Sequence, residues 1–153
     1  MHNLMSAAAA AVLTVAPTPP AIPVTTVAVA VTVHIVDKGL GTPKDETFNI
    51  PMRVGQGMNA MGFQSFACSA GDVRVDFGVF IRRTRAPGTV DARLTASLYE
   101  GGPACSTTDF EGGAFNAWEA VPANSRAQRI LAVGAVPGTG DYAEVRAIFV
   151  NNG

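Results

Sequence analysis

Apolar and polar residues alternate over long stretches of this chain, and this alternation limits the possible fold more than any other feature. From Val73 to Arg82, every second residue is valine, phenylalanine or isoleucine, with mostly polar residues and glycine between them. The side chains of a β-strand point alternately to its two faces, so a period of two is typical of a half-buried strand. Val27–Ile35 and Val90–Leu98 repeat the pattern. The sequence therefore predicts an all-β protein.

The remaining stretches complete a predicted set of about seven strands, the number typical of a small β-sandwich. Pro51 predicts an edge strand, because proline cannot donate to a β-ladder. Ala86-Pro87-Gly88 predicts a tight turn that joins the strands on either side of it into a hairpin. The glycine-rich stretch Gly55–Gly71 is predicted to be a loop. The other predicted strands are Phe48–Val54, Phe115–Val121, Arg126–Val133 and Ala143–Phe149.

These elements indicate a single antiparallel β-sandwich, immunoglobulin-like in outline, over residues 24–153. Residues 1–23 are expected to form a leader. Ser6–Ala16 has the length of a signal-peptide apolar region and is too short to span a bilayer, and the proline-rich stretch Pro17–Pro20 would end any helix there. We therefore expect an exported chain, secreted or at the cell surface, with no transmembrane span.

The chain contains two cysteines, Cys68 and Cys105. They form no C-x-x-C pair, so their spacing does not indicate a zinc or thioredoxin-type site. In an exported chain such a pair favours a disulfide bond. We predict a Cys68–Cys105 disulfide that closes the loop between the two residues.

The last third of the chain resembles small exported bacterial β-sandwich domains of unassigned function. Four segments carry the resemblance: Leu98–Gly101, Cys105–Gly112, Gly140–Ala143 and Val150–Asn152. The resemblance implies the sandwich fold and a strand rather than a helix over Arg126–Val133. It implies no activity and no binding residue.

Composition and motifs argue against several classes of function. The formal net charge of −1 does not favour a nucleic-acid partner, because such binding needs clustered positive charge. The two histidines, His2 and His34, occur in no motif with a nucleophile, so the sequence predicts neither an enzyme nor a bound cofactor.

Two groups of residues are candidates for a site. Asp109, Glu111 and Asp141 lie near predicted strand ends, where carboxylates from converging loops could bind calcium. Tyr99 and Trp118 could form an aromatic platform for a sugar.

The leading hypothesis is therefore an exported, non-enzymatic domain with a binding or structural role, whose partner is an extracellular protein or a glycan. One alternative is an inhibitor of a secreted hydrolase that acts through the disulfide-tethered loop Gly101–Gly113, because a preorganised loop loses little entropy on binding. Another alternative is a calcium- or carbohydrate-binding module.

Overall fold

The computed structural model describes residues 24–39, 42–55, 58–69, 71–101 and 105–153, and its regular structure there consists of strands alone. The all-β prediction is confirmed, with nine strands in place of about seven. The leader predicted for residues 1–23 lies outside the described residues. The strands are β1 (Thr25–Val36), β2 (Lys44–Val54), β3 (Ala60–Cys68), β4 (Arg74–Arg83), β5 (Val90–Glu100), β6 (Asp109–Phe115), β7 (Glu119–Val121), β8 (Ser125–Gly134) and β9 (Tyr142–Asn151).

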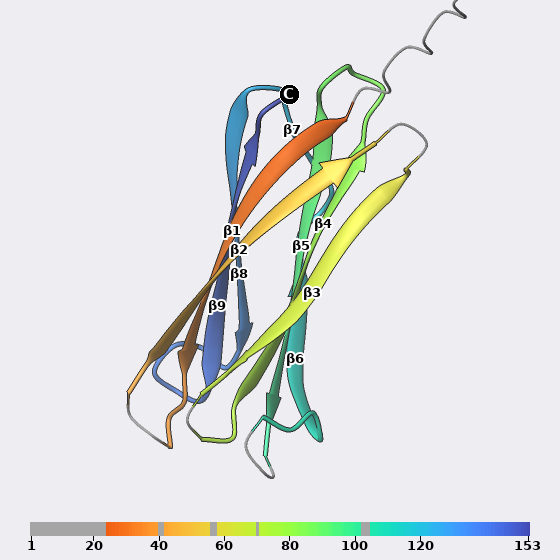
Figure 1. Cartoon of the computed structure of the whole chain (residues 1–153). Helices are drawn as coiled ribbons and strands as arrows, with labels where there is room; N and C mark the ends of the chain where they lie inside the picture. Colours follow the sequence, from red (N-terminus) through yellow and green to blue (C-terminus); the bar gives the residue numbers. More distant parts are fainter. Residues whose placement is uncertain (1–23, 40–41, 56–57, 70, 102–104) are drawn as a thin grey trace, which may run out of the picture.

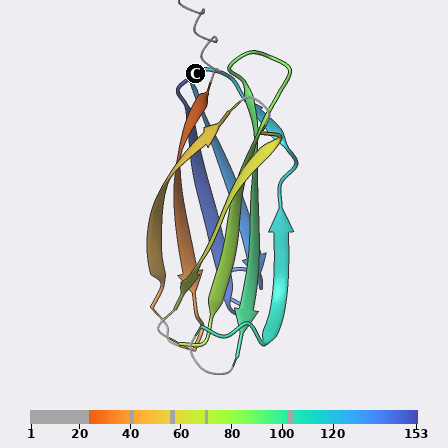
Figure 2. The same ribbon diagram turned by 45° about the vertical axis from the view of Figure 1, so that its right-hand side comes forward.

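The strands form two antiparallel sheets packed face to face (Figures 1 and 2). One sheet has the order β2-β1-β9-β8, and the other has the order β3-β4-β5-β6, with β7 also paired to β5. The predicted two-layer sandwich is thus confirmed. Strands that follow one another along the chain lie next to one another in each sheet, and β9 closes the order by pairing with β1. This connectivity is up-and-down, unlike the Greek-key connections of immunoglobulin domains.

The core lies between the sheets and consists mainly of valine. Alternate residues of the central strands β1, β4, β5 and β9 point inward, and nearly all of them are fully buried. Valine suits this position because its branched side chain packs well on a pleated surface. The largest fully buried side chains are Phe149, Ile35, Met52, Ile81, Leu94 and Leu98.

Several local predictions are confirmed. Pro51 lies in β2, at the edge of its sheet. Strands β4 and β5 form a hairpin, and Gly88 adopts the positive φ of 69° that favours glycine in its turn. Arg126–Val133 lies entirely within strand β8.

The prediction of a loop over Gly55–Gly71 is wrong for Ala60–Cys68, which forms edge strand β3. This strand pairs with β4 on one side only, and its alternate residues from Ala60 to Phe66 are exposed. The inner face of this edge strand is only partly buried, so apolar and polar residues alternate less clearly in it than in a central strand.

The strand predicted over Phe115–Val121 is also wrong in its bounds. Strand β6 ends at Phe115, and the short strand β7 begins at Glu119. Between them, the side-chain oxygen of Asn116 accepts a hydrogen bond of 2.6 Å from the backbone N–H of Leu94. A side chain thus takes the place of a backbone partner from a neighbouring strand. The start of β6 went unpredicted because it contains Gly112 and Gly113 and because the register shifts between Leu98 and Tyr99.

Polar contacts join the two sheets at both ends of the sandwich. At one end, the buried side chain of Asn151 in β9 donates hydrogen bonds to the carbonyl oxygens of Gly88 and Val121, at 2.8 and 2.9 Å. At the other end, the Ser69 hydroxyl donates to Asp37 at 2.8 Å. None of the described residues forms a helix long and apolar enough to cross a membrane.

Candidate binding face

The outer face of the β3–β4–β5–β6 sheet carries most of the aromatic side chains that are not in the core. Residues paired directly across antiparallel strands point to the same side of a sheet. The pairs Gly62–Phe80, Arg74–Tyr99 and Thr95–Phe115 therefore place their side chains on one surface. We call this surface the aromatic–arginine face. It consists of Phe66, Arg74, Phe80, Arg82, Arg93, Tyr99, Phe110, Phe115 and Trp118.

Three guanidinium groups of this face lie over aromatic rings. The pairs and their distances to the ring centroid are Arg74 over Phe66 at 4.1 Å, Arg82 over Trp118 at 4.5 Å and Arg93 over Phe115 at 4.5 Å. Such contacts stabilise by about 0.5–1 kcal/mol at exposed sites. Because each guanidinium lies over a neighbouring ring, the arginine side chains and the rings form one packed surface on the sheet.

The rings nearest the two edges of this sheet are the most exposed. Phe110 is 61% exposed, Phe115 is 68% exposed and Phe66 is 47% exposed. Phe110 also makes an edge-to-face contact with Tyr99, with the ring centroids 5.6 Å apart. Contiguous exposed aromatic surface is unusual in a soluble protein and commonly marks a place of binding.

A hollow of about 370 Å³ lies in the middle of this face. It lies over neighbouring positions of β3, β4 and β5, beside Gly78 in β4, which lies directly opposite Thr95 in β5. The ring of Phe80 lies flat across the neighbouring glycines, since a Cβ atom would come within 2.6 Å of it at Gly62 and 2.7 Å at Gly78. Polar side chains from Gln64, Asp76, Thr95 and Ser97 line the hollow, together with the rings of Phe66 and Tyr99.

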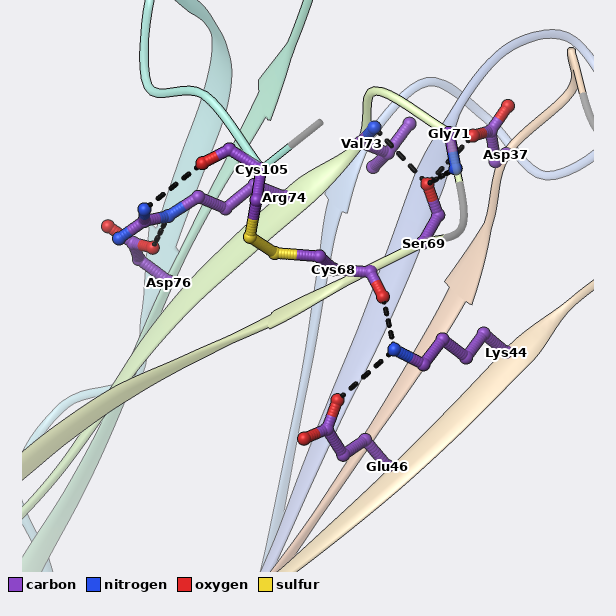
Figure 3. The surroundings of a disulfide bond; sticks show 10 residues. All are labelled: Asp37, Lys44, Glu46, Cys68, Ser69, Gly71, Val73, Arg74, Asp76 and Cys105. Carbon is purple, nitrogen blue, oxygen red and sulfur yellow. Dashed lines mark hydrogen bonds and ion pairs between the residues drawn. A yellow bond between two sulfur atoms is a disulfide. The ribbon is translucent and has the colours of Figure 1, made fainter. Parts of the chain in front are cut away.

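The disulfide borders this face, as Figure 3 shows. Cys68, at the end of β3, is bonded to Cys105, in the loop before β6, as the sequence predicts. The Arg74 guanidinium donates to the Cys105 carbonyl at 3.2 Å and to Asp76 at 2.5 Å. The disulfide thereby holds the loop against the charged pair at the rim of the hollow.

Tyr99 and Trp118, the predicted platform residues, share this face but lie far apart along it. Tyr99 pairs with Arg74, whereas Trp118 packs on Arg82, which pairs with Asp91. Strand β7 pairs Glu119, the residue after Trp118, with Ala92, and Tyr99 lies seven residues from Ala92 along β5, or roughly 24 Å at about 3.4 Å per residue. The two residues therefore do not form one platform. Other aromatic residues of the face lie between them.

The candidate calcium residues lie at the end of the sandwich that also holds the disulfide. A pocket there is lined by Lys38, Glu100, Glu111 and Asp141. Asp109 lies apart from this pocket's lining, and its carboxylate would lie 2.6 Å from a Cβ atom at Gly101. In the part of the chain that the structure describes, no group of three or more carboxylate, histidine or cysteine residues could hold a metal ion.

Within that pocket, Glu100 and Asp141 interact directly. A side-chain hydrogen bond to Asp141 raises the pKa of Glu100, and the negative charge of Asp141 raises it further. Asp141 also accepts a hydrogen bond of 2.5 Å from the backbone N–H of Lys38. The protonated form of Glu100 is therefore favoured beside Asp141.

The structure also places His34 and the loop predicted over Gly101–Gly113. His34 is on the outer face of the other sheet, where its Nδ1 lies 2.7 Å from Asp45. The inhibitory loop predicted over Gly101–Gly113 is shorter than expected, because strand β6 already begins at Asp109. Residues 102–104 of that loop lie outside the described residues.

Sequence reasoning missed most of the aromatic–arginine face. Phe66 and Phe110 belong to strand segments that were predicted as loops, so their outward direction could not be inferred. In β3 and in β4 the two phenylalanines are three positions apart, so they point to opposite faces and give no signal for one aromatic surface. Comparisons with protein-family models, curated proteins and solved structures gave no match.

Proposed function

We propose that this chain is an exported, non-enzymatic binding domain whose ligand lies across the aromatic–arginine face. The observation that carries the proposal is the group of exposed phenylalanine rings on one face of one sheet. Two of these rings, Phe66 and Phe115, each lie beneath an arginine guanidinium. Aromatic residues and arginine are enriched in binding surfaces, where they supply large contact areas at a low cost in entropy.

The charges of this face bear on the kind of ligand that it would bind. Both lysines of the chain, Lys38 and Lys44, lie outside strands β3–β7, so the cations of the face are arginines alone. Arg74 and Arg82 form ion pairs with Asp76 and Asp91, at 2.5 and 3.0 Å. Two of the three arginines of this face are thus neutralised, which does not favour nucleic acid, a ligand that requires an excess of positive charge.

The disulfide supports the proposal of export. Disulfide bonds persist in oxidising compartments and are rare in the cytosol. The proposed localisation is therefore outside the cytoplasm, where the ligand would be an extracellular protein or a glycan.

The test compares two alanine variants that match in exposure and in position. Phe66 and Ile130 are both 47% exposed, and each lies on an edge strand, but on opposite sheets. We would measure binding of the wild type, Phe66→Ala and Ile130→Ala to a panel of polysaccharides and to a displayed library of random peptides. We expect Phe66→Ala to weaken binding about tenfold, equivalent to ~1.4 kcal/mol, and Ile130→Ala to leave it unchanged.

Two results would overturn the proposal. One is binding that depends on Ile130 and not on Phe66, which would place the ligand on the other sheet. The other is the absence of binding to either panel by the folded, disulfide-bonded protein.

A further inference from the structure

The hollow is richer in hydrogen-bonding groups than the surface around it. Beside the rings of Phe66 and Tyr99 and the paired Arg74 guanidinium, it is lined by the amide of Gln64, the carboxylate of Asp76 and the hydroxyls of Thr95 and Ser97. Its volume of about 370 Å³ is near the lower limit of the range of about 300–1,000 Å³ that is usual for small-molecule sites. A cavity of this size accommodates one small unit of a longer ligand.

The charges that line the hollow neutralise each other. Arg74 Nε lies 2.5 Å from Asp76 Oδ1, and no other charged residue lines the hollow. An anionic or cationic ligand would therefore gain little, because each of these charges already has its partner. A neutral ligand with many hydrogen-bonding groups matches this lining, since a carboxylate and two hydroxyls still offer further lone pairs.

A peptide is less well matched to this place than a sugar. Peptides that bind to sheets usually add a strand at an edge, where free backbone groups are available. The hollow lies on the outer face over β3, β4 and β5, whereas the free backbone groups of edge strand β3 lie along the edge of the sheet. Only side chains are therefore available to a ligand here.

We infer that the hollow lined by Asp76, Thr95 and Ser97 is a subsite for one neutral, hydroxyl-rich sugar ring of a glycan that lies along the aromatic–arginine face. The ring's hydroxyls bond with Asp76, Thr95 and Ser97, and its apolar C–H face packs on Tyr99 or Phe66. Sugar rings have this double character, and the hollow presents polar and aromatic groups side by side. This inference rests on the proposed function of the face and adds the class of its ligand.

The test fills the hollow and leaves the surrounding rings unchanged. Ser97→Leu places a larger, apolar side chain in the hollow, and Thr32→Leu makes a similar change on the outer face of the other sheet. Ser97 and Thr32 are both half-buried hydroxyl residues on central strands. We would measure binding of both variants to immobilised neutral, amino and acidic oligosaccharides, and monitor folding by far-UV circular dichroism.

We expect the wild type to bind neutral oligosaccharides, Ser97→Leu to lose at least about tenfold in affinity, and Thr32→Leu to bind as the wild type does. Should Ser97→Leu fail to fold, the smaller β-branched variant Ser97→Val replaces it. In addition, titration of the wild type with the neutral sugar should shift the backbone amide resonances of Thr95 and Ser97.

The other outcomes separate this inference from the proposal on which it rests. If Phe66→Ala loses binding but Ser97→Leu does not, the face binds its ligand elsewhere and the subsite is wrong. If the face binds only acidic oligosaccharides or only peptides, the ligand class is wrong and the binding face stands. If neither Phe66→Ala nor Ser97→Leu affects binding, both are wrong.

Discussion

Glu100 is the residue whose titration departs most clearly from that of a free side chain. Its pKa is raised, first by the hydrogen bond to Asp141 and then by the charge of that carboxylate. A raised pKa means that the folded state binds the proton more tightly than the unfolded state does. The interaction therefore favours the fold at pH values below the ordinary pKa of glutamate, and this contribution is lost as the pH rises through the raised value.

We predict that Glu100→Gln stabilises the protein at neutral pH and has little effect near pH 4. Glutamine keeps a hydrogen-bond donor toward Asp141 but carries no charge, so the repulsion between the two carboxylates disappears. The gain should stay below about 1 kcal/mol, the usual scale for charge pairs screened by solvent. Urea unfolding at both pH values measures it.

The control for this prediction is Glu144→Gln. Glu144 accepts a hydrogen bond of 3.0 Å from Arg146, an oppositely charged partner, so this variant should show no gain at neutral pH. An equal gain in both variants would mean that net charge is responsible, and not the contact with Asp141.

Asn151 is the second residue whose surroundings carry a prediction. Its side chain is 1% exposed and bonds to two backbone carbonyl groups from the opposite sheet. Asn151→Ala would leave those carbonyls buried without their partner, and each such loss costs about 1–3 kcal/mol. We expect a destabilisation of at least about 2 kcal/mol by thermal or urea unfolding.

The neighbouring Asn152 supplies the comparison. Its side chain is exposed, and its backbone N–H donates to Thr26, a bond that the substitution to alanine retains. Asn152→Ala should be nearly neutral. Similar losses in both variants would contradict the role of the Asn151 side chain.

At the scale of single elements, the sequence predicted the central strands well and the edge strands poorly. In β4 and β5, every second residue from Val75 to Leu98 outside the turn is buried, so the alternation directly reflects the fold. In β3 and β6, the outward positions hold Phe66, Phe110 and Phe115, which have apolar side chains facing solvent. The alternation of apolar and polar residues disappears there because this outer face is itself apolar.

The same elements explain how much of the candidate binding face was predictable. Tyr99 and Trp118 were identified as candidates from the sequence, and both lie on the face. The distance between them depends on strand pairing, and so does the hollow, which is lined by residues of the paired strands β3, β4 and β5. No local pattern in the sequence reveals which strands pair or in which register.

The disulfide acts on the elements that it connects, β3 and the loop before β6. Its two cysteines are separated by 37 positions, and closing a loop of that length stabilises by about 4 kcal/mol in the chain-entropy model. We predict that the double variant Cys68→Ser, Cys105→Ser is less stable by about 2–4 kcal/mol. Urea unfolding of the variant and of the wild type measures this difference.

Reduction of the wild type provides an independent check. With a thiol reductant present, the wild type should unfold at the same urea concentration as the double variant, and the variant itself should not respond. A reduced wild type that keeps its full stability would show that the bond contributes nothing to the fold.

For the whole molecule, the residues that stabilise the fold are separate from the face that is proposed to bind. The core between the sheets and the contacts at the two ends hold the sandwich together, while the aromatic–arginine face lies outside both. Substitutions on this face should therefore change binding with little effect on stability. A loss of binding in Phe66→Ala or Ser97→Leu, compared with the matched variants Ile130→Ala and Thr32→Leu, can then be assigned to the face and not to unfolding.

The remaining prediction concerns the complete chain and its compartment. If the chain is exported, the protein recovered from outside the cytoplasm should lack a segment that approximately matches the predicted leader, residues 1–23. Its intact mass should also be two hydrogens lower than that of the same protein after reduction. One mass spectrum reports both properties. The double variant Cys68→Ser, Cys105→Ser is the control, because reduction should leave its mass unchanged. Full-length protein retained in the cytoplasm with two thiols that react freely with an alkylating agent would contradict export, and it would also place the proposed ligand among intracellular molecules.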